Sequence, residues 1–143
     1  MNNISTITLT NKNIKRDQLN NLVPKLWGHE EWIVNNAQYC GKKLVFMKNH
    51  GCSLHHHKIK HETFYVLSGQ VILDLEYNGV RTIRQMGPGD TAAIPQLTWH
   101  RLIALTNAEV MEFSTYHMEE DSYRAINAQK FEQDDIDKLC ELL

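Results

Sequence analysis

Five of the eight histidines lie within twelve positions, at residues 50, 55, 56, 57 and 61. Imidazoles bind transition metals and exchange protons near neutral pH, so this density predicts chemistry rather than packing. In an extended chain, side chains alternate between faces, which places His55 and His57 together and His56 opposite. Glu62 follows in the next predicted strand, and His100 lies on a separate one after a turn-rich segment. Three imidazoles and a carboxylate predict a site for a divalent transition ion, with positions open for substrate or water.

Two further residues are candidates for proton transfer beside such an ion. Lys60 lies on the same alternating face as Glu62, so we expect its ammonium next to the ion, with a pKa lowered enough for proton transfer. Glu112 lies among apolar neighbours in a predicted strand, where a carboxylate needs a partner or a task. An equal alternative is that Glu112 is a carboxylate at the barrel rim, paired with Arg101 or Arg124.

The other histidines are not included in the ligand set. His50, His56 and His61 do not share the face of His55 and His57, and they are expected to be exposed or to support the ligands. His29 and His117 lie outside the cluster and are assigned no role in it. The alternative for the three consecutive histidines is a solvated loop.

The elements that must position these residues are short strands. Six β-rich runs lie between residues 42 and 116. They alternate with turns at residues 49–51, 68–69, 78–79 and 87–89. Many short strands at such spacing predict an all-β antiparallel barrel or jelly roll. Asn78-Gly79 is the strongest hairpin signal, because a two-residue type I′ turn needs positive φ at both central positions.

The two ends of the chain differ from this strand pattern. Residues 4–9 are rich in β-branched side chains and predict a strand or an extended arm. From Phe131 onward, apolar residues follow helical spacing and acidic residues come early, which predicts a single C-terminal helix. The expected organisation is an arm over residues 1–25, a barrel over 26–125 and a helix over 126–143.

Composition narrows the class of protein. The chain has 143 residues, 42% hydrophobic and 22% charged, which suits a single globular core without a membrane span. A net charge of -2 provides no general attraction for nucleic acid. Three cysteines without paired spacing predict reduced thiols, and the polar N-terminal sequence predicts a cytoplasmic protein.

Several of these residues together resemble the two motifs of the cupin superfamily. The matching positions are Gly51, His55, His57, Glu62 and Gly69 in the first motif, and Gly89, Pro95 and His100 in the second. The chain departs from the pattern at Leu97, where the second motif usually has glycine, and at Ala104, where it often has asparagine. The resemblance implies a cupin double-stranded β-helix, a jelly-roll barrel, with the four predicted metal ligands inside it.

Within the cupins, residues 24–125 resemble the type II phosphomannose isomerase domain. The landmarks are the segments 26–32, 55–62 and 119–124. The chain is also similar to the cupin D-lyxose and D-mannose isomerases, in which a lysine at the position of Lys60 serves near the substrate. The resemblance implies a metal-dependent aldose–ketose isomerase that acts on a sugar or sugar phosphate through an enediol. Arg124 would then clamp a phosphate or carboxylate, the alternative being an ion pair with its acidic neighbours at residues 119–121.

Other readings of the same site remain open. Three histidines and a glutamate also suit an Fe(II)-dependent cupin dioxygenase, and the ion could equally belong to a non-catalytic sugar-binding cupin. The expected cofactor is one divalent ion, which the sequence leaves open among zinc, manganese, iron, nickel and cobalt. The expected partners are a small carbohydrate and a second copy of the chain, since small cupin barrels commonly pair through a sheet face and exchange N-terminal strands.

Overall fold

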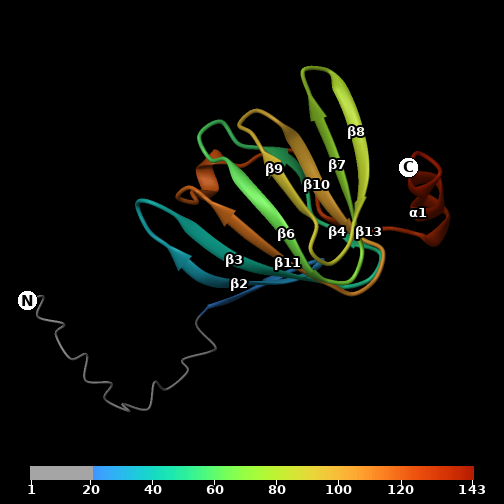
Figure 1. The fold of residues 1–143 in the computed structure, drawn as a ribbon, viewed down its shortest axis with the longest axis horizontal. Coiled ribbons are helices and arrows are strands. Elements are labelled where there is room, and N and C mark those ends of the chain that lie inside the picture. Colours follow the sequence, from blue (N-terminus) through green and yellow to red (C-terminus); the bar gives the residue numbers. More distant parts are fainter. Residues whose placement is uncertain (1–20) are drawn as a thin grey trace, which may run out of the picture.

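The structure, a computed structural model, describes residues 21–143 as two antiparallel β-sheets that face each other, followed by one short α-helix (Figure 1). The all-β jelly-roll architecture and the short C-terminal helix predicted from the sequence are confirmed. The strand expected over residues 4–9 lies outside the described residues. None of the helices within residues 21–143 is long and apolar enough to cross a bilayer.

The first sheet contains six strands, and their spatial order is β1-β2-β3-β11-β6-β9. Their bounds are β1 Leu22–Lys25, β2 Gly28–Asn35, β3 Cys40–Phe46, β6 Glu62–Ser68, β9 Thr91–Ile94 and β11 Ala108–Ser114. Because β3, β6 and β11 lie side by side, residues far apart in the sequence form continuous rows across this sheet.

The second sheet contains seven strands, ordered β12-β5-β10-β4-β13, with β7 paired to β10 and β8 paired to β7. Their bounds are β4 His50–Gly51, β5 Leu54–His56, β7 Val71–Tyr77, β8 Val80–Met86, β10 Trp99–Ala104, β12 Tyr123–Ile126 and β13 Gln129–Lys130. A single 3-10 turn, Glu119–Asp121, precedes β12.

The hairpin predicted at Asn78-Gly79 is confirmed. Strands β7 and β8 pair antiparallel with Tyr77 opposite Val80, which leaves a two-residue loop. The φ angles of Asn78 and Gly79 are 50° and 76°, so both central residues have the positive φ that this turn requires.

The β1–β2 hairpin is not among the strands predicted from the pattern. Strand β2 is half-buried and carries charged residues, which gives no clear apolar alternation. Its Gly28 lies against β3, and a Cβ at this position would collide with the carbonyl of Val45, so the Trp27-Gly28 step requires glycine. This hairpin brings Trp27 into the core and Glu30 to the barrel interior, where both border the cavity described below.

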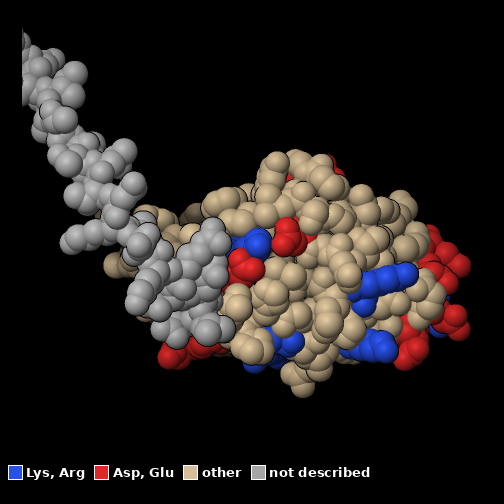
Figure 2. Space-filling model, turned by 90° about the horizontal axis from the view of Figure 1, so that it is seen from below, with Lys and Arg blue, Asp and Glu red and all other residues tan. Residues whose placement is uncertain are grey.

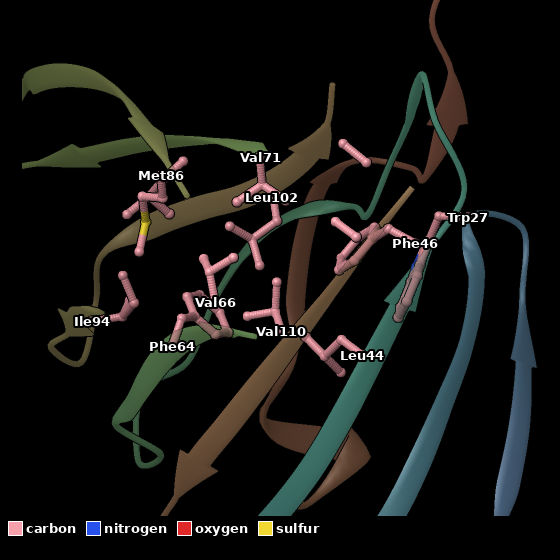
Figure 3. Close-up of a cluster of buried hydrophobic side chains, with 13 residues drawn as sticks. Trp27, Leu44, Phe46, Phe64, Val66, Val71, Met86, Ile94, Leu102 and Val110 are labelled. Carbon is pink, nitrogen blue, oxygen red and sulfur yellow. The ribbon is translucent and has the colours of Figure 1, made fainter. Parts of the chain in front are cut away.

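The main hydrophobic core fills the space between the two sheets. Figure 3 shows Val71 and Leu102 of one sheet pointing toward Val66 and Val110 of the other. At the end of the cluster that the β1–β2 hairpin closes, the ring of Trp27 stacks on a phenylalanine of β3, with centroids 4.3 Å apart.

On the inward face of the first sheet, a row of apolar side chains across the strands is followed, two residues further along each strand, by a row that contains ionisable side chains. Leu44, Val110 and Val66 form an apolar row across β3, β11 and β6. The next row contains Lys42 opposite Glu112 on the same strands. The sequence therefore places buried charges directly beside the hydrophobic core, inside the barrel.

The C-terminal helix α1, Gln133–Cys140, covers part of the outside of the second sheet. Ile136 of the helix and Phe131 before it are buried against Ile72 of β7 and Ile103 of β10. On the face shown in Figure 2, acidic and basic side chains lie in small groups separated by uncharged surface.

Candidate metal centre

Four side chains converge inside the barrel, as the alternation and spacing predict. One ligand atom from each of His55, His57, Glu62 and His100 lies within 4.8 Å of the others. His55 on β5 is directly opposite His100 on β10, while His57 follows β5 and Glu62 begins β6. The cluster therefore draws on both sheets, and three of its four members are fully buried.

Each histidine of the cluster is oriented through its Nδ1 atom, which donates to a backbone carbonyl. The distances are 2.8 Å from His55 to Ser53, 2.9 Å from His57 to Asp121 and 2.8 Å from His100 to Thr98. This assignment of the ring protons leaves the Nε2 lone pairs directed at the centre of the cluster. A hydrogen bond from the second ring nitrogen is the usual arrangement around a metal-binding histidine.

The polar atoms at the centre have no hydrogen-bond partner within residues 21–143. These atoms are Nε2 of His57, Nε2 of His100 and Oε1 of Glu62, and all are buried. His100 Nε2 lies only 2.5 Å from Glu62 Oε1, although with this tautomer both atoms present lone pairs. Lone pairs that approach so closely in a buried site require a cation or a proton between them.

Burial also keeps His55 and His57 neutral, which is the form that binds metal. Burial, together with the neighbouring His100, lowers the pKa of His55 to about 3. Burial lowers the pKa of His57 to about 4, because the attraction of Glu62 offsets desolvation only in part. The donor set of neutral imidazoles and one carboxylate can therefore bind a divalent transition ion.

Asp121 holds the loop that carries His57, and the sequence pattern did not single it out for this role. Its carboxylate accepts backbone N–H groups of Lys58, Ile59 and Lys60 at 2.9, 3.1 and 2.8 Å. Its own carbonyl accepts from His57. Since it is buried and occupied in this way, Asp121 is not the partner of Arg124 that the sequence left open.

Leu97 lies in the loop before His100, at the position where the second cupin motif usually has glycine. Its φ of 63° places it in the left-handed region, which costs a branched side chain energy. Its backbone N–H donates to the carbonyl of His57 at 2.7 Å, so this strained turn links the two ligand-bearing segments.

Lys60 lies between two carboxylates on the barrel interior. Its Nζ is 2.5 Å from Glu112 Oε1 and 2.8 Å from Glu62 Oε2, and all three side chains are buried. Burial alone would lower the pKa of Lys60, but the charges of Glu112 and Glu62 outweigh it and raise that pKa above its usual range. The prediction of a lowered pKa for Lys60 is therefore wrong, because it did not include the second carboxylate, Glu112, which lies 52 residues away in the sequence.

Glu112 is a buried acidic residue whose pKa is shifted toward neutral pH. Burial and the nearby negative charge of Glu62 raise the pKa of Glu112 to about 8. For Glu62, hydrogen bonding to Glu112 and the proximity of His100 overcome burial and hold its pKa well below the usual range. The alternative of a rim carboxylate is wrong, since Glu112 is 6% exposed and Arg101 pairs with Asp74 instead.

A cavity of about 440 Å³ opens from the metal cluster toward the β1–β2 hairpin and β12. Arg124 on β12 borders this cavity opposite His55, with a side chain that is 51% exposed. Its distance to Glu119, Nη2 to Oε2, is 3.9 Å, so this pair is present but long. Arg124 therefore forms the ion pair with an acidic neighbour that the sequence left open, and it also lies at the cavity mouth, where it could contact a substrate phosphate.

The remaining histidines lie away from the cluster centre. His61 is exposed and His50 is half-buried on β4. His56 points to the opposite side of β5, where its ring stacks on Tyr123 with centroids 5.2 Å apart.

Several cavity residues were not identified from the sequence, among them Glu30, Lys42 and His117. Lys42 precedes Leu44 and Phe46 on an alternating apolar face of a predicted strand, and this pattern could have identified it as buried. His117 accepts a contact from Lys60, Nζ to Nδ1, at 3.3 Å. No local signal identifies His117, because this contact joins two segments that are 57 residues apart in the sequence.

The fold and this cluster together define a metal-binding jelly roll of the cupin class. The model of the cupin domain matches residues 43–116, slightly more than half of the chain, and the chain belongs to the cupin family. No curated protein sequence gives a significant match.

Solved structures show the same fold. KdgF from Halomonas sp. is 20% identical, with a TM-score of 0.57, over 64% of this chain and 81% of that one. Oxalate decarboxylase from Bacillus subtilis is 18% identical, with a TM-score of 0.66, over 72% of this chain. The match spans only 29% of the oxalate decarboxylase chain, and at these identities the likeness concerns the fold alone.

Proposed function

We propose that this cupin is a metal-dependent aldose–ketose isomerase acting on an open-chain sugar or sugar phosphate. The observation that carries the proposal is the buried Glu112 carboxyl, which lies on the wall of the cavity that contains the metal cluster and is held by Lys60. A group that holds and releases a proton near neutral pH, next to a Lewis-acid site, suits proton transfer at a carbon beside a carbonyl.

A divalent ion held by His55, His57, Glu62 and His100 would polarise the sugar carbonyl as a Lewis acid. Glu112, as carboxylate, takes the proton from C2 of the aldose and, as acid, returns it to C1. Proton movement between O1 and O2 completes the conversion through the enediol. Lys60 holds the Glu112 carboxyl in place through its contact with Oε1 and keeps it from rotating away from the cavity.

Arg124 is proposed as the residue that distinguishes phosphorylated substrates. Its half-exposed guanidinium at the cavity mouth presents several N–H donors to a phosphate group. For a sugar phosphate, Arg124→Met should raise KM about tenfold or more, while leaving turnover of the unphosphorylated sugar unchanged.

Deuterium incorporation tests the reaction class directly. After metal analysis, the protein is incubated in deuterated water with a panel of aldoses, ketoses and their phosphates, and proton NMR follows the signal at C2. Deuterium at C2 is expected for at least one sugar. Glu112→Gln should abolish the exchange and keep the metal content. The proposal fails if the metal-loaded protein exchanges no C2 proton, and oxygen consumption during turnover would point to a dioxygenase.

We also propose that the protein acts in the cytoplasm as a homodimer. All three cysteines, Cys40, Cys52 and Cys140, are free, which suits a reducing compartment. The outer face of the six-stranded sheet exposes apolar side chains of β6 and β11, and these support pairing through a sheet face.

A further inference from the structure

A second polar site lies along the cavity wall, beyond Glu112 as seen from the metal cluster. Lys42 of β3 is 2% exposed and its side chain borders the cavity. It is paired in register with Glu112 of β11 on one side and with Trp32 of β2 on the other. The ammonium therefore sits inside the barrel rather than reaching the surface.

Within residues 21–143, this ammonium makes no hydrogen bond. Its Nζ is 3.6 Å from Glu30 Oε2 and 3.9 Å from Glu112 Oε2, both beyond the usual range of about 2.7–3.2 Å for an N–H···O bond. The same Nζ lies 4.1 Å from the centre of the Trp32 ring. A buried ammonium with unused N–H donors needs an acceptor from the cavity, either water or a ligand oxygen.

Glu30 supplies the complementary acceptor. Its Oε2 accepts a hydrogen bond from Trp32 Nε1 at 2.7 Å, which fixes the carboxylate. Its Oε1 makes only a 3.6 Å ion pair with Lys25 Nζ, so lone pairs on this oxygen remain available. Glu30 borders the same cavity as Lys42.

A fixed donor and a fixed acceptor a few ångströms apart match two neighbouring hydroxyl groups. One hydroxyl oxygen accepts from Lys42, and the adjacent hydroxyl donates to Glu30. We propose that Lys42 and Glu30 form a vicinal-diol site that binds hydroxyl groups of an open-chain polyol whose reacting end lies at Glu112 and the metal cluster. This inference names the substrate class of the proposed function, but it concerns binding and is tested without turnover.

The test uses isothermal titration calorimetry on the full-length protein with two neutral probes. The hexitol D-mannitol carries vicinal hydroxyls, whereas 1,6-hexanediol has the same chain length without them. D-mannitol is expected to bind and 1,6-hexanediol is not. Lys42→Met should weaken D-mannitol binding about tenfold or more, in line with the loss of a hydrogen bond from a charged group.

Lys43→Met is the matched control, because Lys43 is the next residue on β3 but faces outward and pairs with Glu31 at 3.1 Å. This variant should bind D-mannitol like the wild type. Metal content, measured in parallel, should be equal in all variants, which separates loss of the diol site from loss of the metal cluster. If Lys42→Met does not fold, Lys42→Gln keeps an N–H donor of shorter reach and should still weaken binding severalfold.

Three results would overturn the proposal. They are a wild-type protein that binds neither probe, a folded Lys42 variant with unchanged D-mannitol affinity, and an equal loss of affinity in Lys43→Met. Failure of the isomerase proposal gives a different result. D-mannitol binding that depends on Lys42, together with no deuterium exchange at C2, would refute the reaction but support the diol site.

Discussion

Ionisable residues inside the barrel form a chain of alternating charge. It runs from Glu62 through Lys60 and Glu112 to Lys42 and Glu30 along one wall of the cavity. Buried charges in such an arrangement depend on their neighbours, so the pKa values of Lys60, Glu62 and Glu112 are set by one another. This explains why the pKa of Lys60 rises although burial alone would lower it, and why Glu62 adds to the rise that burial causes in the pKa of Glu112.

Metal binding is expected to depend on the converging histidines and not on the adjacent one. His57→Ala and His100→Ala should each remove most of the bound divalent ion, because each deletes a buried ligand directed at the centre. His56→Ala is the control, since its ring faces the other side of β5 against Tyr123. Elemental analysis after dialysis measures the ion, and an unchanged metal content in both ligand variants would exclude this site.

Stability of the metal-free protein should fall as the pH is lowered from 6.5 to 5. Burial holds the folded pKa values of His55 and His57 at about 3 and about 4, against 6.5 for an unperturbed histidine. In this window the unfolded chain binds protons at His55 and His57 that the folded protein does not, which lowers the free energy of unfolding by up to about 1.4 kcal/mol per pH unit and histidine. Glu112, which is protonated in the folded state because its pKa is about 8, offsets up to one of these two contributions.

Urea denaturation at several pH values, after removal of metal with a chelator, measures this dependence. His57→Gln removes one of the two buried imidazoles and should reduce the slope. A His57→Gln variant with the same pH dependence as the wild type would contradict the buried, neutral state of His57.

At the scale of elements, the register between strands positions the site. Strand β5 provides His55, β6 provides Glu62 and β10 provides His100, and the turn at Leu97 links the His57 loop to the start of β10. Since side chains alternate along each strand, a slip of one residue in any of these pairings would turn a ligand out of the barrel.

Leu97→Gly should stabilise the protein by about 1 kcal/mol, because it relieves a left-handed backbone conformation that disfavours a branched side chain. The leucine side chain is 61% exposed, so little packing is lost. The matched control is Leu97→Ala, which keeps a Cβ and should give no gain. Urea denaturation measures the effect, and a less stable glycine variant would show that the leucine side chain contributes more than its strain costs.

At the scale of the whole molecule, two sheets enclose the cavity, and the outer face of the six-stranded sheet exposes apolar side chains on β6 and β11. Tyr65 and Leu67 of β6 and Phe113 of β11 are exposed on this face, and Phe113 is 52% exposed. Exposed apolar side chains grouped on a sheet face are typical of an interaction surface. It is the surface through which we expect two copies to pair.

Phe113→Asp should convert the expected dimer into a monomer, because it places a charge at the centre of that face. Tyr77→Asp is the control, since Tyr77 is similarly exposed but lies at the β7–β8 hairpin, away from β6 and β11. Light scattering coupled to size-exclusion chromatography measures the mass, against 16.6 kDa for one chain. A wild-type protein that elutes as a monomer at micromolar concentration would refute the dimer.

Local patterns in the sequence were sufficient for much of the fold and for the convergence of the metal cluster. Alternation along a strand is a property of the backbone itself, so it separates His55 and His57 from His56 without knowledge of the partner strands. The Asn78-Gly79 turn is equally local, since two residues with positive φ determine it. The β1–β2 hairpin was not predicted, because β2 is half-buried and charged and shows little alternation between apolar and polar residues.

The tertiary structure decided which ionisable groups meet, and therefore their protonation. Lys60 and Glu112 are 52 residues apart, and His57 and Asp121 are 64 apart, so no local period connects them. Lys42 and Glu112 face each other only because β3 and β11 are neighbours in the first sheet. A pKa depends on distance and burial rather than on residue type, which is why the sequence identified Lys60 and Glu112 but misjudged the protonation of Lys60.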